Sequence, residues 1–340
     1  MSNYKDGIQS RDRAAQESVM AVTPRPTPVR QGGTKSGKRE KSVLGGPTRH
    51  LVREGDARDL SFIETESVHL ICTSPPYGAL KEYPDHPGQL GNIPLYEEFL
   101  DELDKVWKES LRVLVPGGRV ACVVGDICIS RRQGGRHHVL PLSADIQVRA
   151  RHLGFDCLTP IRWMKVANIR LEASRSSRFL GKPNLPNGVV KNDLEHILLL
   201  RKPGGYRKPT SEQERLSFIP TEEYSQLFAP VWTDVSGQLR KDHPAPYPVE
   251  VPRRLARMFS FVGDTVVDPF AGTGTTAVAA MELGRNSVSV EIDPTYVDLI
   301  EKRLSSGQLA ASVEISRNGT RIRPDSRCQP PLTWDHLATN

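Results

Sequence analysis

The stretch Asp264-Thr-Val-Val-Asp-Pro-Phe-Ala-Gly272-Thr-Gly274-Thr-Thr-Ala277 reads as a short buried strand, a glycine turn and the first turn of a helix. The two glycines let the backbone turn tightly and approach a ligand, and Ala277 allows close helix packing. A second strand pattern at residues 286–292 carries Glu291 near its end, where an acidic residue takes the ribose hydroxyls of an adenosine cofactor. No lysine follows Gly274, which disfavours a phosphate-binding P-loop. The spacing therefore predicts a nucleotide-type cofactor site.

Strand and helix patterns alternate along the rest of the chain. Apolar runs predict strands at residues 50–53, 68–73, 119–124, 158–165, 195–201, 265–268 and 286–292. Residues 96–114 carry apolar side chains at helical spacing, and the pattern stops at Pro116-Gly117-Gly118. This alternation predicts an α/β fold with a doubly wound, mostly parallel, seven-stranded sheet that is covered by helices on both faces.

A second motif, Ser74-Pro75-Pro76-Tyr77, directly follows the strand pattern at residues 68–73. Two successive prolines fix the backbone and donate no hydrogen bonds, so their carbonyl groups face outward as rigid acceptors. We call residues 74–77 the proline loop. This loop suits a planar ring with an exocyclic amine, which would donate to Ser74 Oγ and the Pro75 carbonyl while Tyr77 stacks on the ring. A simple proline-rich turn would explain the two prolines alone.

Together the two motifs resemble the amino-group DNA methyltransferases of the β class, in which the catalytic motif precedes the cofactor motif. Residues 74–77 are similar to the catalytic tetrapeptide of the N4-cytosine enzymes, whereas N6-adenine enzymes typically begin with Asp or Asn. Residues 268–276 are close to the family's cofactor motif, and residues 243–248 resemble its upstream companion. Gly55-Asp56-Ala57 resembles the segment that contacts the adenine of the cofactor.

The resemblance implies the permuted fold of the class I S-adenosylmethionine-dependent methyltransferases, with inserted DNA-recognition loops and strands 158–165 and 195–201 as an antiparallel pair. It implies a site-specific enzyme that uses S-adenosyl-L-methionine to methylate N4 of a cytosine flipped out of double-stranded DNA. The catalytic residues would be Ser74, Pro75, Pro76 and Tyr77. The cofactor-binding residues would be Asp56, His243, Pro244, Asp268, Phe270, Gly272, Gly274, Thr275, Thr276 and Glu291. A cognate restriction endonuclease is a candidate partner.

Several alternatives stay open. N6-adenine methylation on the same scaffold is the nearest, because the proline loop accepts any amine on a planar ring. A nonenzymatic DNA-binding module would leave the cofactor turn unexplained, and a nicotinamide dehydrogenase would leave residues 74–77 unexplained. Asp56 and Asp268 could cap helices instead of binding the cofactor. Asp126 is either a proton acceptor after methyl transfer or a turn residue.

Charge is unevenly distributed along the chain. Residues 128–210 hold 16 Lys and Arg against 5 Asp and Glu, whereas the whole chain carries a net charge of +6. A basic zone fits a DNA-facing surface, although an ordinary solvated charge run has the same composition. The predicted DNA-binding residues are Arg131, Arg132, Arg136, Arg170, Arg175, Arg178 and Lys182. Residues 166–193 and 204–241 are the preferred target-recognition segments, and residues 131–138 are a further candidate.

The domain organisation follows from these motifs. A methyltransferase domain is expected at residues 46–305, with a catalytic half at 46–203 and a cofactor half at 242–305. Residues 1–45 are expected to be a basic disordered tail and residues 306–340 a C-terminal extension. The lack of a long apolar run or a signal peptide predicts a cytoplasmic protein without membrane contact. Five cysteines without pairing or ligand spacing predict free thiols and no metal, and the oligomeric state stays open.

Overall fold

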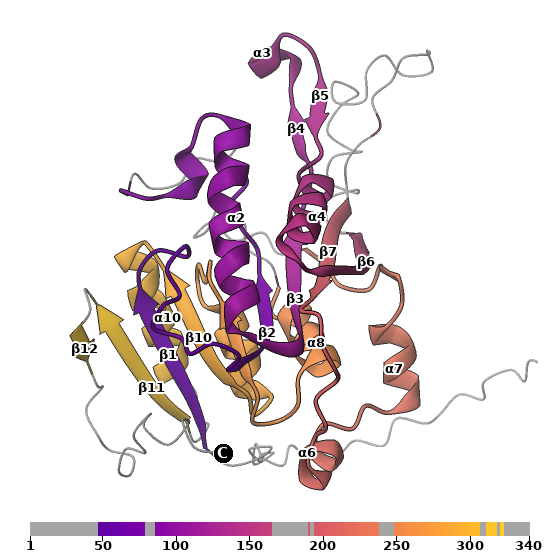
Figure 1. Ribbon diagram of the computed structural model, residues 1–340, viewed down its shortest axis with the longest axis vertical. Coiled ribbons are helices and arrows are strands. Elements are labelled where there is room, and N and C mark those ends of the chain that lie inside the picture. The colour runs from indigo at the N-terminus through magenta and orange to yellow at the C-terminus, as the bar shows by residue number, and fades with distance from the viewer. Residues whose placement is uncertain are drawn as a thin grey trace, which may run out of the picture. The chain divides into compact units, whose positions relative to one another are not determined.

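The computed structural model describes residues 47–78, 86–164, 190, 194–237, 248–306, 311–317 and 320–322 (Figure 1). The strands are β1 (Thr48–Glu54), β2 (Val68–Thr73), β3 (Leu114–Val124), β4 (Ile127–Ile129), β5 (His138–Leu140), β6 (Asp156–Met164), β7 (Leu194–Arg201), β8 (Val231–Trp232), β9 (Thr265–Asp268), β10 (Asn286–Glu291), β11 (Ala311–Arg317) and β12 (Thr320–Ile322). The helices are η2 (Leu90–Asn92), α2 (Tyr96–Val113), α3 (Arg131–Gly134), α4 (Leu142–Leu153), α6 (Ser211–Leu216), α7 (Thr221–Leu227), α8 (Glu250–Phe259), α9 (Thr275–Glu282) and α10 (Pro294–Ser305).

The main sheet has the strand order β12-β11-β1-β10-β9-β2-β3-β7-β6-β8. The six neighbours from β11 to β3 run parallel, as expected of an α/β fold. Strand β7 is antiparallel to both β3 and β6, which confirms the antiparallel pair predicted from the resemblance. The sheet is therefore mixed and mostly parallel.

The predicted number of seven strands is wrong, because ten strands of the described residues join this sheet. Strands β8 and β12 have only two and three residues, which is too short to produce a period. Strand β11 pairs with β1 from Thr48 and Ala311 to Arg53 and Ser316, so the sheet continues past the domain boundary expected at residue 305. Its sequence, Ala-Ser-Val-Glu-Ile-Ser-Arg, alternates apolar and polar residues, although only Ile315 and Ser316 of the strand are buried. The tail expected at residues 1–45 lies outside the described residues.

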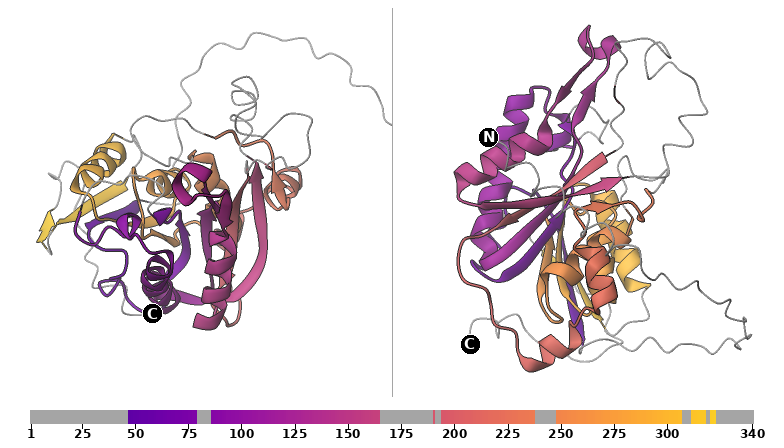
Figure 2. Two further views of the ribbon diagram at one scale, coloured as in Figure 1. Left: turned by 90° about the horizontal axis from the view of Figure 1, so that it is seen from above. Right: turned by 90° about the vertical axis from the view of Figure 1, so that its right-hand side faces the viewer.

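Two hydrophobic layers hold helices against the two faces of the sheet (Figure 2). Val120 and Cys122 of β3 face helices α2 and α4, whereas Ala121 and Val123 face helix α8. Helix α2 begins at the predicted residue and buries Phe99, Leu100, Leu103, Val106 and Trp107 on one side. Each large apolar side chain buried in this way stabilises the fold by roughly 1.5–3 kcal/mol. The helix ends at Val113, and β3 starts at once, so that Pro116-Gly117-Gly118 lie inside the strand.

Within the described ranges, no helix is both long and apolar enough to span a membrane. The four cysteines in the described part of the chain, Cys72, Cys122, Cys128 and Cys157, are free thiols. Cys328 lies outside that part.

Candidate functional site

A cleft opens at the carboxyl ends of β1, β10, β9 and β2, which are consecutive neighbours in the sheet. It encloses about 820 Å³, counting the solvent at its mouth. Its walls are Gly55, Asp56, Ala57, Ser74, Pro75, Pro76, Gly88, Gln89, Leu90, Pro269, Phe270, Ala271, Gly272, Thr273, Thr275, Val290, Glu291, Ile292 and Tyr296. The proline loop and the glycine turn therefore face one space, at the edge of a parallel sheet where ligands bind.

The glycine turn between β9 and α9 is built on left-handed backbone. Gly272 has a φ of 52° and Gly274 has a φ of 77°, values that residues other than glycine rarely adopt. A Cβ on Gly274 would also lie 2.9 Å from Ile300 Cγ2 of α10, so helix packing as well as backbone shape requires glycine there. The Arg303 guanidinium donates to the Thr273 carbonyl and braces the turn from the side of α10.

Glu291, at the end of β10, presents a buried carboxyl group to the cleft. Oε2 accepts the Gly272 N–H at 2.7 Å, and Oε1 accepts the Asp293 N–H at 3.0 Å. Burial raises the pKa of Glu291 from an ordinary value of 4.5 to about 7, more than the two backbone hydrogen bonds lower it. The side chain thus holds the turn and titrates near neutral pH.

Asp268 lies behind the wall of the cleft. Its side chain is 2% exposed and is not part of the cleft wall. Oδ1 accepts the Thr73 hydroxyl at 2.7 Å and the Phe270 N–H at 3.1 Å, and Oδ2 accepts the Thr276 hydroxyl at 2.7 Å. We call Thr73, Asp268 and Thr276 the Asp268 cluster. It joins the residue before the proline loop to the glycine turn, behind the wall of the cleft.

Asp56, after β1, both lines the cleft and closes a local turn. Its Oδ1 accepts the Arg58 N–H at 2.9 Å, and its Oδ2 lies 2.5 Å from Arg58 Nη2. The hydrogen bond to Asp56 raises the pKa of the Arg58 guanidinium. Arg58 also contacts Glu102 at 2.5 Å and the Gly88 carbonyl at 3.3 Å. The Asp56 carboxylate is therefore positioned by Arg58, which belongs to none of the sequence motifs and was not predicted as a site residue.

The proline loop lies between the cleft and β3. Pro75 and Pro76 are buried, and Ser74 is half-buried at the cleft wall. The Tyr77 ring is 9% exposed and lies on the side of β3 and β7, where its hydroxyl donates to Glu195 Oε1 at 3.3 Å. Tyr77 does not belong to the wall of the cleft. Ser74, at the start of the motif, therefore lines the cleft, whereas Tyr77, at its end, faces β7.

Asp126 follows β3 and contacts both helix α4 and strand β7. Its Oδ1 accepts the Ser143 N–H at 2.9 Å, in the first turn of α4. Its Oδ2 lies 3.8 Å from His196 Nε2 on β7. The carboxylate thus caps a helix and ties it to the end of β3.

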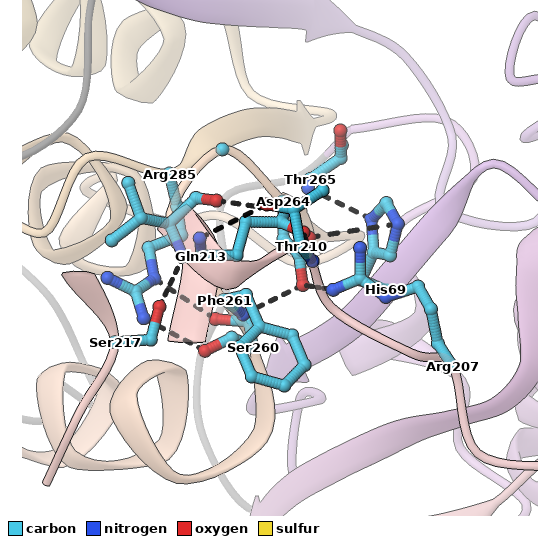
Figure 3. A network of polar contacts seen from close by, with 12 residues as sticks. His69, Arg207, Thr210, Gln213, Ser217, Ser260, Phe261, Asp264, Thr265 and Arg285 are labelled. Carbon is cyan, nitrogen blue, oxygen red and sulfur yellow. Dashed lines mark hydrogen bonds and ion pairs between the residues drawn. The ribbon is translucent and has the colours of Figure 1, made fainter. Parts of the chain in front are cut away.

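The structure places part of a predicted recognition segment at the edge of the sheet opposite the cleft. Residues 204–217 follow β7 and pack at the amino ends of the parallel strands, where α6 lies at the lower edge of Figure 1. Gln213 Nε2 donates to the Val262 carbonyl at 3.2 Å, and Ser217 Oγ accepts the Val262 N–H at 2.8 Å (Figure 3). Residues 204–217, the first part of the recognition segment expected at residues 204–241, are therefore anchored at the edge of the sheet opposite the cleft.

Asp264 is the centre of the same polar network (Figure 3). It is 2% exposed, and its Oδ2 accepts the Phe261 N–H at 2.8 Å and a hydrogen bond from the Arg207 guanidinium. His69 Nδ1 accepts the Thr265 N–H at 3.1 Å, so its proton lies on Nε2, which faces Asp264 Oδ1 at 3.8 Å. Burial lowers the pKa of His69 and keeps the ring neutral.

Several predicted residues cannot be placed. His243, Pro244, Arg170, Arg175, Arg178 and Lys182 lie outside the described residues, as do residues 166–189, 191–193 and 238–241. Arg131, Arg132 and Arg136 are exposed between β4 and β5. In the described ranges, no group of three or more His, Cys, Asp or Glu side chains could hold a metal ion.

The chain is similar to known proteins over most of its length. Residues 68–302 match the model of a family described as DNA methylase, N6 and N4 type. The type II methyltransferase M.MjaI of Methanocaldococcus jannaschii is 37% identical over 294 residues, which cover 77% of this chain and 93% of that protein. M.MthZI of Methanothermobacter thermautotrophicus is 34% identical over 284 residues, covering 76% and 77%.

Solved structures agree. TTHA0409, a putative DNA modification methylase from Thermus thermophilus in complex with S-adenosyl-L-methionine, is 45% identical with a TM-score of 0.65, covering 80% of this chain and 99% of that one. The cytosine-N4-specific PvuII DNA methyltransferase is 21% identical with a TM-score of 0.56, covering 79% and 91%. At that identity the second likeness concerns the fold alone.

Proposed function

The chain belongs to the DNA methylase family, and from this premise we propose that it methylates N4 of a cytosine flipped out of double-stranded DNA at a specific sequence. It is a DNA methyltransferase of the restriction-modification type that uses S-adenosyl-L-methionine. The observation that carries the proposal is one cleft at four neighbouring strand ends, whose lining includes Ser74 and the two prolines together with the glycine turn and Glu291.

The residues of the cleft fit this cofactor. Glu291 would accept hydrogen bonds from the ribose hydroxyls, and Asp56 would lie near the adenine. Phe270, Gly272 and Thr275 complete the wall beside them. When bound, S-adenosyl-L-methionine supplies a methyl group that is activated by a sulfonium. We assign His243 and Pro244 to the same site from the resemblance alone.

The proline loop supplies the groups that act on the base. The exocyclic amine of cytosine is a poor nucleophile, because its lone pair is delocalised into the ring. Ser74 Oγ and the Pro75 carbonyl would accept hydrogen bonds from the two amino N–H groups, localise the lone pair and aim it at the methyl group. Tyr77, oriented by Glu195, would stack on the extruded ring. Methyl transfer by this loop depends on the orientation of the amine and on electrostatics, and it does not require a strong base before the amine attacks the methyl group.

Cytosine is preferred over adenine because serine leads the tetrapeptide. N6-adenine methylation by the same loop is the alternative, since the acceptors fit any amine on a planar ring. The likeness to type II methyltransferases supports a cognate restriction endonuclease as a partner. The order of the proline loop before the glycine turn supports the permuted arrangement, with the catalytic half at residues 46–203 and the cofactor half at 242–305.

The proposal is tested by transfer of a labelled methyl group to genome-length duplex DNA. Ser74→Ala should lower kcat by about 100-fold, the usual effect of losing one polar group aimed at the reacting atoms. The Kd for S-adenosyl-L-methionine, measured by calorimetry, should change little because Ser74 acts on the amine. Ser61→Ala, a change at an exposed loop serine, is the matched control and should keep full activity.

Equal turnover in Ser74→Ala and wild-type protein would contradict the role of Ser74. Failure of the wild-type protein to label any duplex, despite cofactor binding, would contradict the function itself.

A further inference from the structure

The β4–β5 hairpin projects beyond the edge of the sheet that carries the cleft (Figures 1 and 2). The hairpin starts at Ile127, shortly after the end of β3, and Gly125 and Asp126 form the link. Strand β3 is parallel to β2, and Cys122 of β3 pairs with Thr73 of β2. Gly125 lies against the proline loop, since a Cβ built on Gly125 would be 3.6 Å from Tyr77 Cε1. The hairpin therefore rises directly beside the place proposed for the extruded base.

The base of the hairpin is fixed to the body of the protein. Its register pairs Ile127 with Leu140 and Ile129 with His138. Ile127 is buried, and Ile129 and Leu140 pack against the hydrophobic core that contains α2 and α4. Asp126 before the hairpin accepts the N–H of Ser143 after it, which closes the base at 2.9 Å. The direction of the hairpin relative to β3 is thus set by packing and a hydrogen bond.

The tip of the hairpin carries exposed positive charge. Residues 127–140 contain three arginines and no Asp or Glu. Arg131, Arg132 and Arg136 are exposed, and no ion pair to them occurs among the described residues. By contrast Arg149, on the following helix α4, pairs with Asp101 at 2.7 Å and Asp104 at 2.8 Å. Among the described residues, no carboxylate therefore competes with an external acceptor for these three guanidiniums.

The dimensions of the hairpin suit a DNA groove. Three residues per strand at about 3.3 Å each give a ribbon about 10 Å long before the turn. The major groove of B-DNA is about 12 Å wide and about 8.5 Å deep and admits a two-stranded ribbon. Arginine is the side chain that most often reads a base there, through two hydrogen bonds to guanine.

We propose, resting on the function proposed above, that the β4–β5 hairpin enters the major groove beside the extruded base and reads base edges with Arg131, Arg132 or Arg136. The hairpin is then a specificity element separate from the cofactor cleft. Residues 204–217, the first part of the recognition segment expected at residues 204–241, lie at the opposite edge of the sheet.

The test uses a pool of duplexes that together contain every six-base sequence, incubated with the full chain and S-adenosyl-L-methionine. Methylated positions are then mapped by sequencing, which gives the preferred site without knowing it beforehand. The variants are Arg131→Gln, Arg132→Gln and Arg136→Gln, singly and combined. Arg151→Gln is the matched control, because Arg151 is exposed at the other end of α4 and its change removes the same charge.

At least one hairpin variant should relax the preference at one position of the site by about tenfold or more, the effect of losing a base-reading arginine. Arg151→Gln should keep the wild-type preference, and the Kd for the cofactor should stay constant in all variants. An unchanged site in all single variants would overturn the proposal. So would a uniform loss of methylation over all sequences with a shallower salt dependence, which is the behaviour of a phosphate contact. Absence of methylation by the wild-type protein would instead contradict the proposed function.

Discussion

At the scale of single residues, the Asp268 cluster couples the two halves of the site. Thr73 precedes Ser74, and its hydroxyl donates to the carboxylate of Asp268, which is 195 residues later in the chain. The same carboxylate accepts hydrogen bonds from the Phe270 N–H and the Thr276 hydroxyl. All three hydrogen bonds lie behind the cleft, so the cluster positions the proline loop against the glycine turn without needing to contact a ligand.

Thr73→Val keeps the shape of the side chain but removes its hydrogen bond to Asp268. We expect the free energy of unfolding to fall by about 1–3 kcal/mol, since a buried carboxylate loses one donor. We also expect kcat to fall more than the affinity for S-adenosyl-L-methionine, because the proline loop loses its anchor while the glycine turn keeps Thr276. Urea denaturation and steady-state kinetics measure both, and Thr73→Ser should restore them. Wild-type kcat in Thr73→Val would show that the hydrogen bond does not position the loop.

Glu291 should make stability and cofactor affinity depend on pH. Its pKa is about 7 in the folded protein against an ordinary value of 4.5. Between these values the folded state binds more protons than the unfolded state, so the contribution of Glu291 to stability is lost as pH rises through about 7. Ribose hydroxyls favour the ionised carboxylate, so affinity for S-adenosyl-L-methionine should instead rise with pH over the same window.

Calorimetry of cofactor binding between about pH 5 and about pH 9 tests this linkage. Glu291→Gln should bind more weakly at high pH and should lose the rise, because the amide does not titrate. Asp298→Asn, an exposed carboxylate on α10, is a control that should keep the rise. An identical pH profile in Glu291→Gln would remove Glu291 as its source.

At the scale of elements, sequence reasoning succeeded where apolar periodicity is strong. Helix α2 and strands β2, β9 and β10 begin at the expected residues, because each buries a regular set of side chains. It did not assign β11, although the residues of that strand alternate between apolar and polar, and it did not predict the anchoring of residues 204–217. Both depend on long-range partners, β1 for the strand and Asp264 with Val262 for the segment, and a local pattern does not record such partners.

The anchoring of residues 204–217 leads to a stability prediction. Arg207→Met should lower the free energy of unfolding by about 2–4 kcal/mol, because it leaves the Asp264 carboxylate buried without its guanidinium partner. The methylated sequence should stay unchanged below the unfolding temperature, since the network lies at the edge opposite the cleft. Lys208→Met removes the same charge at an exposed neighbour and should cost little. Equal urea midpoints for the two variants would contradict this role of Arg207.

At the scale of the whole molecule, the order and type of the two motifs predicted that they face one site, and the cleft agrees. The sequence could not assign individual contacts within it. Asp268 and Thr276 lie behind the wall, although their motif predicted cofactor contact. Arg58, Leu90 and Tyr296 help to build the cleft without belonging to any motif, because they are brought there by folding and not by spacing in the chain.

The central claim, methylation of cytosine at N4, is tested most directly by the identity of the product. Unmethylated genome-length duplex DNA is incubated with the protein and S-adenosyl-L-methionine and digested to nucleosides, which are separated by chromatography and identified by mass spectrometry. Chromatographic standards separate N4-methylcytosine from 5-methylcytosine, which has the same mass. We predict N4-methylcytosine as the product, strongly reduced with Ser74→Ala. N6-methyladenine as the sole methylated base would contradict the assignment of cytosine.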